Sequence, residues 1–196
     1  MNFEEIKEHD EKCYYEVNKR DLFTDFKEYN KAFKNIKNNI NKQIEKLVNR
    51  LGELKRNKVV ILSGFPGSGK STITEGLKNL DYKVLSLDDK IKDYKELIKK
   101  TQYYIKRKTT NNIVLDGTFL KQEQIDMFKW VNDVVNYDLI TIHIDIPVEY
   151  AYFNNIKRCL DKRNKRTALP FRVYKQMDGT KTVKIAENDT YVIKYE

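Results

Sequence analysis

The stretch GFPGSGKST, Gly64 to Thr72, comes directly after the apolar run Val59–Leu62. Its three glycines let the backbone bend so that successive N–H groups face the same side. The helical pattern that starts at Lys70 would point its positive N-terminal end toward the same place. The stretch therefore predicts a phosphate-binding loop that joins a buried strand to a helix.

The spacing Gly64-x-x-x-x-Gly69-Lys70-Ser71 matches the Walker A pattern of nucleotide-binding proteins. In this pattern the lysine reaches the β- and γ-phosphates, and the hydroxyl of the following serine ligates Mg²⁺. We therefore expect ATP and Mg²⁺ as cofactors, with Lys70 as a catalytic residue and Ser71 as the metal ligand. The expected nucleotide-binding residues of the loop are Gly64, Phe65, Pro66, Gly67, Ser68, Gly69, Lys70, Ser71 and Thr72.

From Lys58 onward, short apolar runs alternate with helical patterns. Strands are expected at Val59–Ser63, Lys83–Leu87, Asn112–Asp116 and Leu139–Asp145, and helices at Lys70–Leu80, Lys90–Arg107, Lys121–Val135 and Val148–Cys159. This alternation predicts an α/β fold, a parallel sheet flanked by helices, with its site at the carboxyl ends of the strands. In the tail, Thr182–Ile185 and Thr190–Tyr195 predict a small antiparallel β-hairpin.

Residues 1–57 are expected to form an N-terminal helical extension of a domain that spans residues 58–196. Apolar residues recur in the extension at steps of three or four, at Phe33, Ile36, Ile40, Ile44, Leu47, Leu51 and Leu54. Such a stripe predicts one long helix with a single apolar face. A helical hairpin packed on the main domain would bury this face, and so would self-association or partner docking through a coiled coil. The stripe carries no evident chemistry, so we expect the extension to be dispensable for the reaction.

The chain of 196 residues carries a formal net charge of +9. The segment Lys90–Lys108 holds eight basic and two acidic residues, and Lys157–Arg166 holds six basic and one acidic. Such clustering favours a polyanionic partner, although two solvated helix faces would give the same pattern. The sequence contains two cysteines, Cys13 and Cys159, without metal-like spacing. No apolar run approaches the ~20 residues that span a bilayer, so we expect a cytoplasmic protein that does not enter a membrane.

Acidic residues follow two of the expected strands. Asp88 and Asp89 end the second strand, where a carboxylate can take the proton from an attacking hydroxyl. Either of them could instead cap the next helix, and Asp89 is the better candidate for that role. Asp116 ends the third strand and could hold a magnesium-bound water, orient the acceptor, or simply form a turn with Gly117.

Three arginines, at 158, 163 and 166, follow the fourth strand. An arginine that closes over the γ-phosphate would offset the charge that gathers there during transfer. The competing interpretation is a solvated basic helix end.

These residues together resemble the polynucleotide 5′-kinase family, over about residues 58–178. Leu87-Asp88-Asp89 aligns with an Arg-Asp-Asp motif of the family, whose first aspartate is the general base. The segment from Asn154 to Arg158 aligns with its lid motif, and the resemblance implies a lid near residues 154–170. The implied catalytic residues are Asp88, Lys70 and Arg158, Arg158 also binding nucleotide. The implied acceptor-binding residues are Asp89, Lys92, Asp116 and Thr118.

The chain departs from the family at three positions. Leu87 stands in place of the arginine before the base, Ile91 in place of an acceptor-binding arginine, and Asn154 in place of the earlier lid arginine. No phosphatase signature is present in the chain. The motifs therefore define the residues that bind the acceptor less well than the residues that bind ATP.

The resemblance implies transfer of the γ-phosphate of ATP to 5′-hydroxyl ends of DNA or RNA, in nucleic acid repair. The basic segment Lys90–Lys108 suits that acceptor, and Tyr94, Tyr103 and Tyr104 within it could stack on bases or pack in the core. The alternative is a P-loop kinase of a small molecule, such as a nucleoside, a sugar or, as in zeta-toxin-like kinases, a nucleotide-sugar. A non-catalytic nucleotide-binding protein is a third possibility, which the intact Lys70 and Ser71 disfavour.

Overall fold

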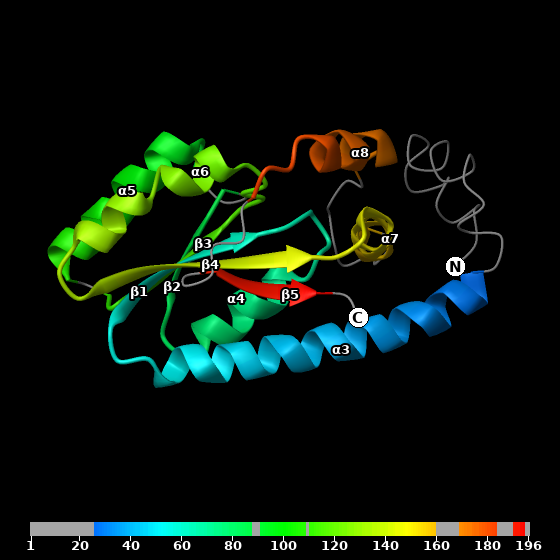
Figure 1. The fold of residues 1–196 in the computed structure, drawn as a ribbon, viewed down its shortest axis with the longest axis horizontal. Helices are drawn as coiled ribbons and strands as arrows, with labels where there is room; N and C mark the ends of the chain where they lie inside the picture. The colour runs from blue at the N-terminus through cyan, green and yellow to red at the C-terminus, as the bar shows by residue number, and fades with distance from the viewer. Residues whose placement is uncertain (1–25, 88–90, 109, 160–168, 184–189, 195–196) are drawn as a thin grey trace.

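The computed structural model describes residues 26–87, 91–108, 110–159, 169–183 and 190–194. Five strands form one sheet in the order β2-β3-β1-β4-β5, and every neighbouring pair is parallel. The strands are β1 Asn57–Ser63, β2 Lys83–Ser86, β3 Asn112–Asp116, β4 Tyr137–Asp145 and β5 Thr190–Lys194. The expected α/β fold with a parallel sheet is confirmed (Figure 1).

Helices cover both faces of the sheet (Figure 1). They are α3 Phe26–Glu53, α4 Lys70–Lys78, α5 Tyr94–Arg107, α6 Gln122–Asp126, α7 Val148–Cys159 and α8 Phe171–Gly179. Alternate residues of β1 point to opposite faces: Val60 and Leu62 pack with α3, α4, α7 and α8, and Val59 and Ile61 pack with α5 and α6. None of the helices in the described part of the chain combines the length and the apolar character needed to cross a membrane.

The single helix expected at Lys121–Val135 is wrong in detail. The chain forms α6 and then a short 3₁₀ helix, Lys129–Asp133, with Phe128 in a non-helical conformation between them. The break lets Ile125, Phe128 and Val131 all reach the same core. Packing therefore overrides the helical pattern at this point.

The expected β-hairpin in the tail is also wrong. Its second arm is β5, which pairs in parallel with β4 and extends the main sheet, with Thr190 opposite Thr141. Thr182 and Val183 of the first arm are not in a strand, and residues 184–189 lie outside the described residues. Ile193 of β5 is buried in the main core, which gives β5 more apolar contact than an isolated two-stranded hairpin would.

The apolar stripe of α3 packs against α4 and β5 of the same chain. Four of its members are buried in the main core, namely Ile40, Ile44, Leu47 and Leu51, while Leu54 is partly exposed. The side chains of Phe33 and Ile36 lie outside the described residues. Gln43 also bonds both backbone groups of Lys194 in β5, at 2.9 and 3.2 Å. The buried part of the stripe is therefore covered by the chain's own main domain and not by a second chain.

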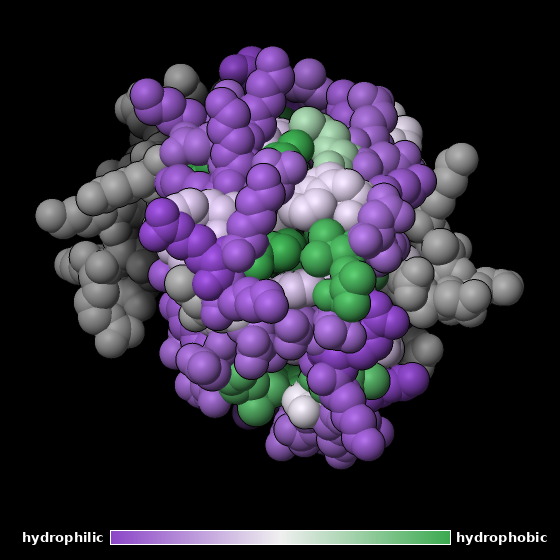
Figure 2. Space-filling model, turned by 90° about the vertical axis from the view of Figure 1, so that its left-hand side faces the viewer, coloured by the Kyte–Doolittle hydropathy of each residue, from purple (hydrophilic) through white to green (hydrophobic). Residues whose placement is uncertain are grey.

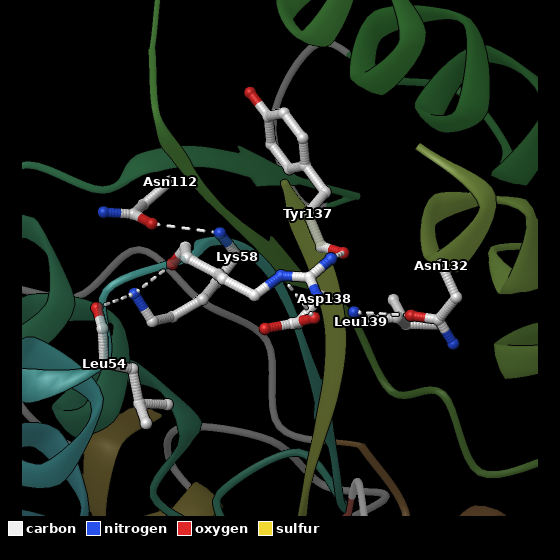
Figure 3. A network of polar contacts seen from close by, with 8 residues as sticks. Leu54, Lys58, Asn112, Asn132, Tyr137, Asp138 and Leu139 are labelled. Atoms are coloured by element: carbon white, nitrogen blue, oxygen red, sulfur yellow. Dashed lines mark hydrogen bonds and ion pairs between the residues drawn. The ribbon is translucent and has the colours of Figure 1, made fainter. Parts of the chain in front are cut away.

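A network of polar contacts fixes the end of α3 to the sheet (Figure 3). The Lys58 ammonium, in β1, donates to the carbonyls of Leu54 and Arg56 at 2.8 and 2.6 Å. Arg56 pairs with Asp138 at 3.2 Å and donates to the Tyr137 carbonyl at 3.0 Å, both in β4. Burial lowers the pKa of Lys58, and the charge of Asp138 partly offsets this. The carbonyls of Leu54 and Arg56, just after the end of α3, thus have a cation as partner.

Candidate active site

The phosphate loop joins β1 to α4, as expected from the sequence. Gly64, Gly67 and Gly69 have φ values of 152°, 84° and 109°, which residues with a side chain rarely adopt. A Cβ at Gly67 would also collide with the carbonyl oxygen of Ala151 in α7. The loop conformation therefore requires glycine, and α7 lies directly against it.

Lys70 folds back over the loop. Its ammonium donates to the carbonyls of Gly64 and Phe65, both at 2.8 Å. Helix α4 begins directly after the loop, so the positive end of its dipole faces the loop. Lys70 and this helix end together give the loop a positive potential suited to phosphate.

A cavity of about 720 Å³ opens beside the loop, a size typical of small-molecule sites. Its walls come from the loop and α4, from β2 and β3 and the residues that follow them, from α7, and from Leu169, two residues before α8. The lining residues are Pro66, Gly67, Gly69, Lys70, Ser71, Thr74, Glu75, Lys78, Val84, Ser86, Leu87, Asp116, Gly117, Thr118, Asn155, Arg158 and Leu169. The cavity thus brings together the predicted residues Lys70, Ser71, Asp116, Thr118 and Arg158.

Four residues of the predicted nucleotide set do not line this cavity. Phe65 and Ser68 are buried, and Gly64 lies at the base of the loop. Thr72 and Ser68 face a small pocket of about 50 Å³ on the α3 side of the loop. Gly64, Phe65, Ser68 and Thr72 therefore shape the loop rather than face the cavity.

Asp116 lies beside Leu62 at the end of β3, across from the start of α4. Its carboxylate accepts a hydrogen bond from the Thr74 hydroxyl at 3.4 Å. Ser71 is exposed in the same cavity, so a hydroxyl and a carboxylate oxygen both face it. Mg²⁺ commonly takes one or two such protein oxygens together with phosphates and waters. These residues fit an Mg²⁺–nucleotide complex, and the described residues hold no cluster of three metal-ligating side chains that would suggest a metal bound by protein alone.

Helices α7 and α8 hold the outer side of the loop. Asn154 of α7 donates to the Gly67 carbonyl at 2.6 Å, and Tyr174 of α8 donates to the Pro66 carbonyl at 2.9 Å. One turn after Asn154, Arg158 lines the cavity. Asn154, which stands where the resembled family has an arginine, is thus bonded to the loop itself. No local sequence signal marks Tyr174 for this contact.

A set of polar contacts, buried at Ser63 and His143, lies at the base of the loop. Ser63 donates to the Phe119 carbonyl at 2.7 Å and lies 2.8 Å from Nδ1 of His143, while Lys181 pairs with Asp145 at 2.6 Å. Burial and the charge of Lys181 lower the pKa of His143, against the opposing effect of Asp145. Burial alone would raise the pKa of Asp145, but the hydrogen bond and charge of Lys181 lower it. His143 is therefore a neutral structural group.

Several predicted residues fall outside the site or outside the described residues. Asp88, Asp89, Arg163 and Arg166 belong to the second group. Lys92 is exposed, and its backbone N–H bonds to Glu96 within the start of α5. Among the residues described, none from α5 lines the cavity.

The basic helix α5 runs away from the cavity. It connects the end of β2 to the start of β3, so its last turn lies where the strands begin. This end of the molecule presents a mainly hydrophilic surface with a few apolar side chains (Figure 2). Tyr94 packs edge-on against Phe119 in the core, whereas Tyr103 is 49% exposed beneath Arg107. The structure thus brings neither the basic residues of α5 nor Tyr103 into the predicted site, whereas Tyr94 lies beside it, against Phe119 and Thr118.

Known structures resemble the chain in fold. A sugar kinase from Janibacter sp. HTCC2649 shares 17% sequence identity and superposes with a TM-score of 0.50 over 70% of this chain and 84% of that one. The chain has a P-loop kinase fold. A gluconokinase from Sinorhizobium meliloti 1021 shares 13% identity, with a TM-score of 0.48 over 71% of this chain and 83% of that one.

No family model matches the chain, and no curated protein does. At such low identity the structural likeness shows the fold and not the family. The resemblance to polynucleotide 5′-kinases therefore remains an inference from the motifs.

Proposed function

We propose that this protein is a kinase that transfers the γ-phosphate of ATP, in the presence of Mg²⁺, to a hydroxyl group of a small molecule. The observation that carries this proposal is the Lys70 loop, which forms one wall of a 720 Å³ cavity whose other walls hold Asp116 and Arg158. The sugar kinase with a similar fold is consistent with it.

The predicted residues of the cavity have separate parts in the proposed reaction. Lys70 would exchange the carbonyls of Gly64 and Phe65 for β- and γ-phosphate oxygens, and the N-terminus of α4 would stabilise the same charge. Ser71 and Asp116 would hold Mg²⁺, which supplies further charge neutralisation at the phosphates. Arg158 would offset the charge that grows on the transferred group. By the motif resemblance, Asp88 takes the proton of the attacking hydroxyl.

The far wall of the cavity favours a compact acceptor. Among the described residues, it is formed beyond the loop by residues of β2 and β3, by the residues that follow these strands, and by Leu169. The long basic helix that would follow a polynucleotide backbone faces away from it. A small acceptor with one or more hydroxyl groups needs no such helix, whereas polymer binding relies on a basic surface continuous with the site.

A 5′-hydroxyl kinase of DNA or RNA, with a role in nucleic acid repair, is the second candidate. It is favoured by Arg158, which lines the cavity in the motif shared with that family. The net charge of +9 is compatible with it.

Transfer of label from γ-³²P-ATP separates the two candidates. The protein is incubated with a pool of nucleosides and sugars, and separately with 5′-OH oligonucleotides of both sugar types. We expect label on a member of the small-molecule pool. Label on oligonucleotides alone would establish the second candidate, and ATP binding without transfer to any acceptor would contradict both.

A further inference from the structure

Four buried side-chain atoms in the described part of the chain have no hydrogen-bond partner. They are Ser68 Oγ, Tyr82 OH, Trp130 Nε1 and Asn155 Nδ2. A buried donor without an acceptor is destabilising, and native proteins keep few of them. Of these four residues, Asn155 alone lines the 720 Å³ cavity.

Asn155 is held firmly against the phosphate loop. It is 9% exposed, and its backbone nitrogen would lie 3.0 Å from a Cβ at Gly67. The preceding residue, Asn154, bonds the Gly67 carbonyl, which fixes α7 against the loop. Arg158 follows Asn155 by three residues and therefore shares its side of the helix. The unpartnered amide thus belongs to a residue that packs against the loop and lines the same cavity as Arg158.

We propose that Asn155 binds the donor nucleotide, by donating a hydrogen bond from Nδ2 to a phosphate oxygen. This inference rests on the proposed function, because it assumes that ATP occupies the loop. The side-chain amide turns about a torsion with broad wells, so Nδ2 reaches the cavity without movement of the helix. A phosphate oxygen is a charged acceptor and would satisfy this donor more strongly than a neutral group.

The proposal predicts opposite effects of one substitution on stability and on binding. Asn155→Leu keeps a similar shape but removes the unpartnered donor. The melting temperature of the ligand-free protein should therefore rise, because the buried polar group is gone. The Kd for ATP·Mg²⁺ should rise by about 10- to 100-fold, the usual loss for a hydrogen bond to a charged group. Differential scanning calorimetry and isothermal titration calorimetry of the full chain measure the two quantities.

Tyr82→Phe is the matched control. It also removes an unpartnered buried donor, but Tyr82 precedes β2 and does not line the cavity. Burial raises the pKa of Tyr82 to about 12, so the group removed is a neutral phenol at assay pH. This variant should raise the melting temperature and leave the Kd for ATP·Mg²⁺ unchanged.

Asn155→Asp provides a second variant of the same size. It replaces the donor with a carboxylate that repels phosphate, so its Kd should rise more than that of Asn155→Leu. Titrations with ADP and AMP show which phosphate Asn155 binds. The variants should lose affinity only for nucleotides that carry that phosphate.

Two results would overturn the proposal. One is an unchanged Kd in Asn155→Leu, and the other is a fall in melting temperature, which would make the amide a structural group. Failure of the proposed function gives a different result, because the transfer assay with γ-³²P-ATP would then label no small molecule, whatever the Kd of these variants for ATP·Mg²⁺.

Discussion

At Gly67 the phosphate loop and helix α7 meet with no room for a side chain. The residue has a φ of 84°, and a Cβ would overlap the Ala151 carbonyl. Gly67→Ala should therefore displace α7 or the loop and raise the Kd for ATP by more than about tenfold, since several loop contacts shift together. Gly179→Ala, at the end of α8, is the control because no atom lies near its Cβ. Equal ATP affinities of the two variants, measured by calorimetry, would contradict this.

His143 predicts how stability depends on pH. Its pKa in the folded protein lies below the ordinary value, so the unfolded chain binds a proton more readily. The contribution of His143 to the free energy of unfolding is therefore full above about pH 6.5 and is lost as pH falls below it. Asp145, whose pKa is also lowered, loses its contribution only at lower pH, below its ordinary value of 3.8.

His143→Asn is the variant that tests this dependence. Urea unfolding between pH 5 and pH 8 should show a smaller decrease toward acid than in wild type. An identical decrease in both proteins would assign the pH dependence to other groups.

The residues of the loop could be predicted from sequence because their spacing is local. The pattern that predicts the loop spans eight positions and consists of Gly64, Gly69, Lys70 and Ser71. Asn155 and Tyr174 could not be predicted, since each meets the loop from a helix about a hundred residues away in the chain. Their roles depend on how α7 and α8 pack, which no short pattern specifies.

The sequence does not predict what helix α3 packs against. Its apolar stripe predicts one apolar face, but that face could equally pack on the main domain or on a second chain. In the structure Leu51 is fully buried in the main core, whereas Leu54 is 38% exposed. Leu51→Ala should lower the free energy of unfolding by about 2–5 kcal/mol, the usual effect of a buried cavity. Leu54→Ala should change it by less than about 1 kcal/mol. Denaturant titrations that give equal losses would contradict the packing of α3.

The packing of α3 also changes the expectation for truncation. Removal of residues 1–53 would expose the apolar surface of α4 and β5 and remove the contact of Gln43 with Lys194. We therefore expect the shortened chain to be less stable than the full chain. The expectation from the sequence, that residues 1–57 are dispensable for the reaction, concerns the chemistry and stays a prediction.

For strand β5, too, the sequence predicts the element but not its neighbour. The alternating, β-branched residues of Thr190–Tyr195 predict a strand. Its partner, β4, begins at Tyr137, and the parallel pairing needs the whole α7 and α8 connection. Periodicity predicts strands but not which strand lies beside them.

At the scale of the whole molecule, the basic side chains of α5 are separated from the cavity. Lys99 and Lys106 of α5 are exposed and do not line the cavity. The double substitution Lys99→Glu and Lys106→Glu should leave the rate of phosphate transfer to a small acceptor unchanged at physiological salt. For a polynucleotide acceptor the same change would weaken binding in a strongly salt-dependent way. Transfer rates at two salt concentrations distinguish the two cases.

Isothermal titration of the full chain with ATP·Mg²⁺, beside the Lys70→Ala variant, tests most directly whether the loop holds a nucleotide donor. The Lys70 ammonium donates to the carbonyls of Gly64 and Phe65 in the loop. Circular dichroism would verify that the Lys70→Ala variant is folded. We predict saturable binding with a Kd between about 1 μM and 1 mM for wild type, in the usual range for enzyme substrates. Lys70→Ala should bind at least about tenfold more weakly, because a charged partner of the phosphates is lost. Absence of ATP binding by the wild-type protein, or equal binding by a folded Lys70→Ala protein, would contradict the phosphate-loop account of this site.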